Sequence, residues 1–125
     1  MTTIPAPVPE SDSQAGDVVV LAQADHTLVL LYGEIDLRCT DDLEQAGRYC
    51  IDAAQYAIMD VRRVALIDSV GLSFVIRLAA GLQAAGTELL LRGPNPGVAE
   101  LVTLVGAEHL VRWEPQAAEQ DAEAN

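Results

Sequence analysis

Short apolar runs alternate with segments of helical periodicity, and this alternation limits the folds open to the chain more than any other feature. Five short segments are rich in Val, Leu, Ile and Tyr and favour strands: 17–23, 27–32, 56–61, 87–91 and 109–113. Three others repeat apolar residues at helical spacing: one from Cys39 or Thr40 to Ala53, then 72–85 and 98–105. The predicted order is therefore β-β-α-β-α-β-α-β.

The connections between these segments predict the sheet. The short polar turn at 24–26 favours a hairpin, so the first two strands should be antiparallel. Strands and helices then alternate, which implies parallel crossovers. We predict an α/β fold with a mixed five-stranded sheet covered by helices. Gly33 should end the second strand, leaving 33–36 as a loop, and Gly86 should cap a helix.

The chain has 125 residues, half of them apolar, which fits one globular domain. We expect that domain at 17–115, with a flexible tail at 1–16 and an acidic flexible tail at 116–125. No apolar run approaches the roughly 18 to 20 residues of a membrane-spanning helix. The first residues also lack the basic and apolar pattern of a secretory signal. We therefore expect a cytoplasmic protein without membrane insertion.

The net charge of −12 restricts the partners of the chain. An acidic surface repels nucleic-acid phosphates and anionic lipid headgroups, so direct nucleic-acid binding is not expected. Cys39 and Cys50 would lie about 16 Å apart on one helix, too far for a disulfide. No zinc pattern accompanies them, and His26 and His109 fit surface positions. We expect no metal, no cofactor and no catalytic residues.

Asp68 and Ser69 stand where a strand gives way to a helix. Both residue types are favoured N-caps, worth about 1 kcal/mol, so a plain cap is one interpretation. The other is a modification site, because a serine at a helix start beside a loop can reach solvent. Ser73 is a competing site. It lies one turn into the helix, so we expect it to be partly shielded.

Four features together resemble a known family: Gly33-Glu34-Ile35-Asp36, the Asp68-Ser69 step through Gly71-Leu72 into a helix, Gly86, and the segment from Pro94 to Pro96 before a short helix. They are similar to the STAS domain, whose members include the bacterial anti-sigma-factor antagonists. The resemblance covers about 17–115. Its most specific part is 65–73 (ALIDSVGLS), at the junction where the family keeps its phosphorylated serine.

The resemblance implies a bacterial regulatory protein that is not an enzyme. An unphosphorylated antagonist binds an anti-sigma factor, which is also a serine kinase, and so frees a sigma factor for transcription. The kinase then phosphorylates the antagonist, here at Ser69, and a phosphatase resets this partner switch. The partner-binding residues expected from the family are Asp36, Asp68, Ser69, Val70, Gly71 and Leu72. Val70 departs from the family, because many antagonists have a second serine at this position.

Other functions of the same fold stay open at this stage. Free-standing STAS domains also serve as cytoplasmic subunits of lipid-transport ATP-binding-cassette systems, where the serine need not be modified. Some relatives are thought to bind nucleotides, which the acidic composition disfavours. A weak homodimer is kept as an alternative to a monomer.

Overall fold

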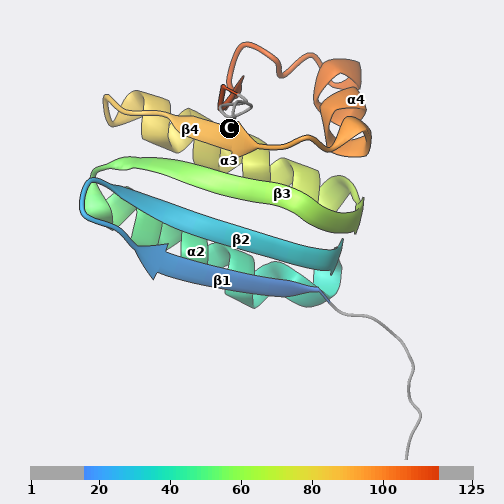
Figure 1. Cartoon of the computed structure of the whole chain (residues 1–125), viewed down its shortest axis with the longest axis horizontal. Helices are drawn as coiled ribbons and strands as arrows, with labels where there is room; N and C mark the ends of the chain where they lie inside the picture. Colours follow the sequence, from blue (N-terminus) through green and yellow to red (C-terminus); the bar gives the residue numbers. More distant parts are fainter. Residues whose placement is uncertain (1–15, 116–125) are drawn as a thin grey trace, which may run out of the picture.

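The computed structural model describes residues 16–115 (Figure 1). Along the chain, the elements are β1 (Asp17–Ala22), β2 (His26–Ile35), the 3-10 helix η1 (Leu37–Cys39), α2 (Thr40–Ala53), β3 (Tyr56–Ile67), α3 (Ser69–Ala84), β4 (Leu89–Arg92), α4 (Pro96–Leu104) and β5 (Arg112–Trp113). This is the predicted order. The two segments expected to be flexible tails lie outside the described residues, apart from Gly16.

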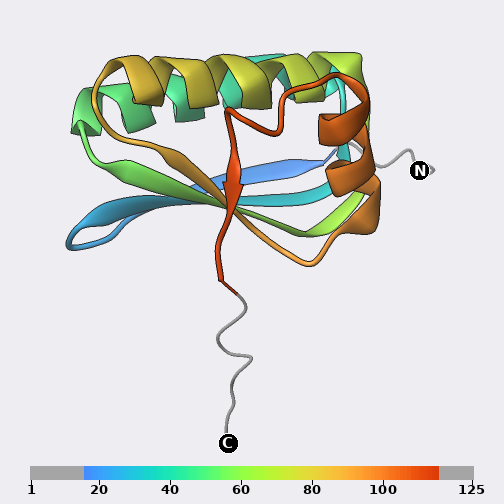
Figure 2. The same ribbon diagram turned by 90° about the horizontal axis from the view of Figure 1, so that it is seen from above.

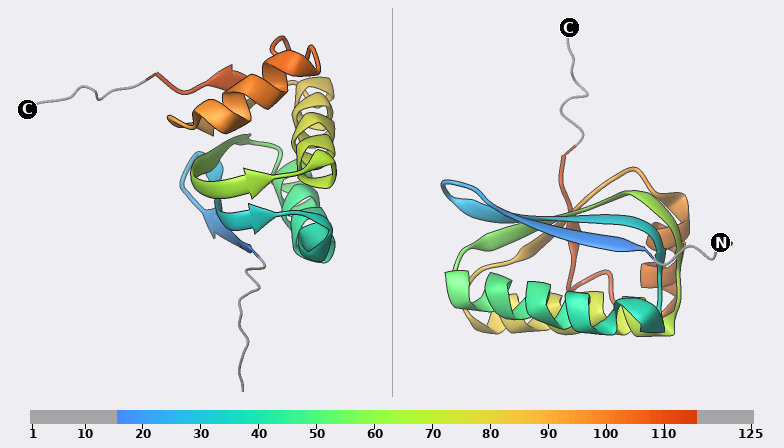
Figure 3. Two further views of the ribbon diagram at one scale, coloured as in Figure 1. Left: turned by 90° about the vertical axis from the view of Figure 1, so that its right-hand side faces the viewer. Right: turned by 90° about the horizontal axis from the view of Figure 1, so that it is seen from below.

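The elements form one mixed sheet in the order β1-β2-β3-β4-β5. β1 and β2 pair antiparallel, and every later neighbour pairs parallel, as the sequence predicts. α2 and α3 lie side by side on one face of this sheet, while α4 packs at one end (Figures 2 and 3). The prediction of a sheet covered by helices therefore holds for one face, and the described residues place no helix over the other.

The hydrophobic core lies between the sheet and the α2–α3 layer. Val29, Met59 and Leu91 point into it from three neighbouring strands and are fully buried. Leu43 of α2 and Leu82 of α3 meet them from the helical side. Burying one such side chain contributes about 1.5 to 3 kcal/mol, so this layer fixes both helices against the sheet.

Two strands run further than the sequence predicts. Gly33 does not end β2: it adopts a φ of +75° and forms an irregularity within the strand, which continues to Ile35. Glycine takes this backbone angle without the strain that other residues meet. β3 likewise continues beyond Val61 to Ile67. Both strands therefore end together, at the start of α3.

The helix ends follow ordinary capping chemistry. Asp68 caps α3, and the side chain of Asn95 caps α4 by accepting from the Val98 amide at 3.2 Å. α3 begins at Ser69, three residues before the predicted start. At its other end, Gly86 has a φ of +85°, and its amide donates to the Gln83 carbonyl. The predicted glycine cap is thus confirmed.

Candidate functional site around Ser69

Ser69 is the first residue of α3, directly after the carboxyl end of β3. Its side chain is exposed, and within the described residues its hydroxyl has no hydrogen-bond partner. The left view of Figure 3 looks at the end of the molecule where β2 and β3 finish. Ligand sites of open α/β sheets commonly lie beyond the carboxyl ends of the strands, so this is a favourable place for recognition.

Asp68 holds Ser69 in this position. One carboxylate oxygen, Oδ1, accepts from the Val70 amide at 2.9 Å and from the Gly71 amide at 3.1 Å. The Asp68 amide in turn donates to the Ile35 carbonyl at 3.2 Å, which ties the junction to the end of β2. The cap and the candidate modification site are therefore neighbouring residues.

Gly71 and Leu72 lie beneath the surface. A Cβ on Gly71 would stand 2.8 Å from the Ile35 carbonyl oxygen and from Ile67 Cγ1, so α3 approaches β2 too closely for a larger residue. Leu72 is buried, with 7% of its surface exposed. Both residues pack inside the domain, and their predicted contact with a partner stays a prediction. Val70 is half-buried beside them.

Asp36 forms a charged cluster with Arg38 and Glu34 next to the site. Its carboxylate accepts from Arg38 Nε at 3.0 Å and from Nη2 at 2.8 Å, and Nη2 also donates to Glu34 Oε1 at 3.0 Å. The hydrogen bonds from Arg38 hold the pKa of Asp36 below its ordinary value. Asp36 is therefore ionised, but Arg38 neutralises much of its charge. η1 contacts α3, which brings this cluster close to Ser69.

Two exposed leucines complete the surface, and sequence reasoning did not identify them. Leu37 is 70% exposed in η1, and Leu66 is 58% exposed near the end of β3. β2 and β3 pair Glu34 with Leu66, so both leucines lie by the same strand ends. Their signal in the sequence was weak, because both leucines lie outside the strands and helices that the sequence predicts. We call Leu37, Leu66, Ser69 and Asp36 the Ser69 surface.

Other groups considered from the sequence lie elsewhere. Ser73 is exposed instead of partly shielded, because it lies on the outer side of α3. His26 stacks on Tyr56 at the opposite end of β2. Cys39 and Cys50 are buried free thiols. Within residues 16–115, no cluster of His, Cys, Asp or Glu side chains could hold a metal, and no helix is long and apolar enough to cross a bilayer.

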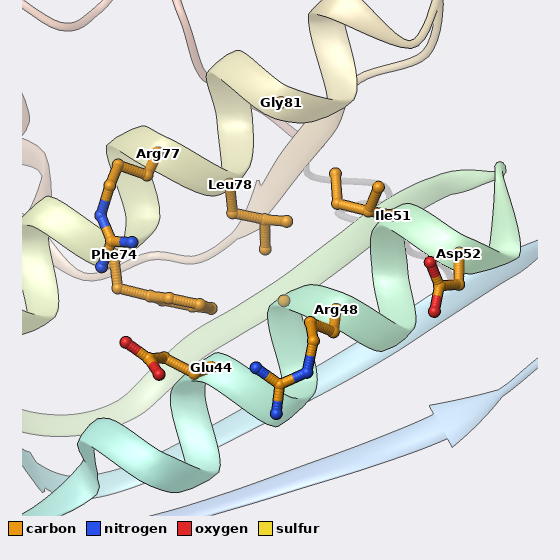
Figure 4. A pocket seen from close by; sticks show the side chains of 9 residues that line it. Glu44, Arg48, Ile51, Asp52, Phe74, Arg77, Leu78 and Gly81 are labelled. Carbon is orange, nitrogen blue, oxygen red and sulfur yellow. The ribbon is translucent and has the colours of Figure 1, made fainter.

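A groove of about 360 Å³ runs between α2 and α3, away from Ser69. Figure 4 shows Phe74 and Leu78 of α3 facing Ile51 of α2 across it, with charged side chains along both rims. Gly47 and Gly81 widen the groove, because they place no side chain in it. None of the residues predicted to form the site lines this groove.

Comparison with known proteins identifies the family. The model of the Mlab STAS domain matches residues 19–112, most of the chain. The chain therefore belongs to the STAS family, as the sequence motifs predict. No sequence among the curated proteins gives a significant match.

Solved structures show the same fold. An anti-sigma factor antagonist from Mycobacterium paratuberculosis is 22% identical, over 84% of this chain and 90% of that one, with a TM-score of 0.69. Unphosphorylated SpoIIAA is 19% identical, over 82% and 91%, with a TM-score of 0.63. Phosphorylated SpoIIAA of Bacillus is 17% identical, over 82% and 93%, also with a TM-score of 0.63. At these identities the likeness establishes the fold.

Proposed function

We propose that this protein is an anti-sigma-factor antagonist. It binds an anti-sigma factor that is also a serine kinase, and phosphorylation of Ser69 ends that binding and so regulates sigma-dependent transcription. The observation that carries the proposal is the exposed Ser69 hydroxyl, held at a strand-to-helix junction between an acidic cap and two exposed leucines. A kinase needs this accessibility, and a partner needs the apolar surface beside it.

The apolar part of the Ser69 surface supplies the binding energy in this account. Leu37 and Leu66 expose most of their side chains, and burial of such area under a partner is favourable by about 25 cal/mol per Å². The polar groups beside them, Asp36 and Arg38, already satisfy each other. They can therefore stay at the rim of an interface without leaving an unpaired charge.

Phosphorylation at Ser69 changes the surface and leaves the fold intact. A phosphate adds about −1.5 to −2 charges at pH 7. The helix amides that could receive it, those of Val70 and Gly71, already donate to Asp68. The phosphate therefore stays exposed next to a carboxylate. A partner surface that is apolar or acidic at this point would bind the phosphorylated protein more weakly, because the phosphate would be desolvated or repelled there.

Two findings support the switch. The fold is that of SpoIIAA, whose structures include an unphosphorylated and a phosphorylated form, so a chain of this fold accommodates the modification. The segment 65–73 also places a serine where the STAS resemblance expects the phosphorylated one. A phosphatase would return the protein to its binding form.

A second candidate function is that of a STAS subunit in a lipid-transport ATP-binding-cassette system. The observation that favours it is the matching family model, which is described as the Mlab STAS domain. In this alternative, the Ser69 surface binds an ATPase subunit, and the serine acts without modification. The two candidates share one binding surface but differ in the partner and in the effect of phosphate.

Isolation of the tagged protein from its own cells separates the two candidates. Copurifying proteins are identified by mass spectrometry for the unaltered protein, for Ser69→Ala and for Ser69→Asp. A serine kinase retained by the first two and lost by Ser69→Asp supports the antagonist. An ATP-binding-cassette ATPase retained by all three supports the transport subunit and overturns the antagonist.

A further inference from the structure

The face of the sheet that α2 and α3 leave uncovered carries three arginines. Arg62 and Arg63 of β3 and Arg92 of β4 line one cavity of about 290 Å³. Its other lining residues are Leu28, Leu30, Leu31, Tyr32 and Asp60. Lys and Arg together number only seven in a chain whose net charge is −12. This concentration of positive charge, here called the arginine cluster, is therefore unusual for this chain.

An irregularity in β3 creates the arginine cluster. Leu30 pairs with Asp60 and Tyr32 pairs with Arg63, so β3 has one residue more than β2 in this stretch. Without that extra residue, strict alternation would turn either Arg62 or Arg63 toward the core. The bulge keeps both guanidinium groups outside, while Val61 and Val64 remain buried on the other side.

The arginine cluster has more positive than negative charge. Arg62 Nη2 bonds to Asp60 Oδ2 at 2.7 Å. Arg92 binds Glu114 through two bonds, of 2.6 Å and 3.0 Å. Arg63 lies within ion-pair distance of no carboxylate in the described part of the chain. One guanidinium is thus left to attract an anion from outside residues 16–115.

An apolar strip adjoins the arginine cluster on the same face. β1 and β2 pair Val19 with Leu30 and Leu21 with Leu28, so these four side chains share one side of the sheet. Val19 and Leu21 are 38% and 40% exposed. The face therefore offers partly exposed apolar groups beside an unbalanced positive charge.

The chain itself leads an acidic segment to this face. The described residues end at Pro115, on the side of the sheet away from α2 and α3 (Figure 2, and the right view of Figure 3). The bonds between Glu114 and Arg92 fix this exit point at the arginine cluster. Residues 116–125 follow, with the sequence QAAEQDAEAN.

The spacing of the acids in this segment suits the face. Glu119, Asp121 and Glu123 alternate with Gln120 and Ala122, so an extended chain would turn all three carboxylates to one side. Glu119 lies five positions after Glu114, a reach of up to about 17 Å. Neighbouring strands lie about 4.8 Å apart, so the acids can reach β3 and β2 from the exit point.

We propose that residues 116–125 bind the open face of the sheet as an intramolecular acidic ligand. Glu119, Asp121 and Glu123 pair with the arginine cluster. Intramolecular attachment makes such weak ion pairs effective, because the segment is never far from its site. A second copy of the chain fits this face poorly, since two arginine clusters would then oppose each other. Occupation of the face by this segment would keep other acidic molecules away from it.

A spin label on the segment of the full chain tests this proposal. Cys39 and Cys50 are buried, so a nitroxide reagent reacts selectively with Ala122→Cys. NMR amide intensities are compared with the label oxidised and reduced. Docking predicts intensity loss for amides at 28–32 and 60–63 on the open face, and little loss in α2 and α3. Equal loss on both faces would overturn the proposal.

Two charge variants provide a matched comparison. Arg63→Gln removes the unpaired charge of the cluster and should lower the ratio of docked to free segment about two- to fivefold, the range for one exposed ion pair. Arg77→Gln removes the same charge from α3 and should leave the intensities unchanged. Identical behaviour of the two variants would contradict specific pairing. A mixture of labelled chain with isotope-enriched unlabelled chain should show no loss, and loss there would assign the contact to a second copy instead.

Discussion

The Asp68 carboxylate accepts a hydrogen bond from the Gly71 amide at 3.1 Å, and this bond sets the first turn of α3. Because Asp68 takes the capping role, the hydroxyl of Ser69 is left exposed at the helix start. The same turn needs a glycine at position 71, where helix and β2 approach closely. The geometry of the site thus depends on the Asp68 cap and on the small size of Gly71.

Substitution of Ser69 should separate charge from size in partner binding. We expect Ser69→Asp to weaken binding of the anti-sigma factor by about tenfold or more, because a charge pressed against an apolar or acidic surface costs over about 1.4 kcal/mol. Asparagine is nearly the same size as aspartate but uncharged. Ser69→Asn should therefore bind the anti-sigma factor within a few-fold of the affinity of the unaltered protein. Isothermal titration calorimetry measures both. Equal affinities of the two variants would show that negative charge at position 69 does not weaken partner binding.

The exposed leucines should contribute to binding and little to stability. Leu37→Ser and Leu66→Ser should each change the free energy of unfolding by less than about 0.5 kcal/mol, as expected for exposed positions. Each should weaken partner binding by more than about 1 kcal/mol if these side chains are interface anchors. Leu21→Ser, an exposed leucine at the other end of the sheet, is the matched control. An equal loss of binding in that control would argue against a local interface.

Gly71→Ala should destabilise the protein. The new Cβ would lie 2.8 Å from the carbonyl oxygen of Ile35, so α3 or β2 must shift, at a cost of about 1 to 3 kcal/mol. Gly97→Ala in α4 is the matched control, because its Cβ meets nothing closer than 3.5 Å. That change should be neutral or stabilise by up to about 1 kcal/mol through helix propensity. Urea denaturation compares them, and similar effects would disprove the close approach at Gly71.

Asp60 should make stability depend on pH in the acid range. Burial opposes its charged form, but hydrogen bonds from Arg62 outweigh burial and hold the pKa of Asp60 below its ordinary value of 3.8. A lowered folded pKa contributes stability above the unfolded value, and this contribution is lost as the pH falls toward the folded pKa. The difference in unfolding free energy between the unaltered protein and Asp60→Asn should therefore shrink below about pH 3.8. Trp113 fluorescence in urea follows it, and a difference that stays constant down to pH 2 would refute this role.

Much of the fold could be predicted because its signals are local. The polar turn at 24–26, Gly86 and the apolar periodicities are each contained in a few neighbouring residues, and the element order followed from them. The extent of β2 and β3 could not be predicted in this way. Gly33 and the Arg62-Arg63 pair looked like strand ends. In the structure β2 and β3 continue to pair beyond these residues, with register shifts at both places.

The candidate site could be predicted only in part for a related reason. The helix cap at Asp68-Ser69 could be predicted, because a capping side chain bonds to amides only two or three residues away. The burial of Gly71 depends on its distance to Ile35, which lies in another element. The exposure of Leu66 likewise results from a register shift between β2 and β3. The burial of Gly71 and the exposure of Leu66 both depend on how segments distant in sequence pack together, so no local sequence pattern predicts them.

The most direct test of the central claim is the mass of the intact protein after incubation with ATP and a lysate of its own cells. We expect one added phosphate, mapped by fragmentation to Ser69. Ser73→Ala should gain the same phosphate, and Ser69→Ala should gain none. Phosphorylation of Ser69→Ala to the full extent would contradict the site. Absence of phosphate in a lysate that modifies a control antagonist would contradict the switch itself.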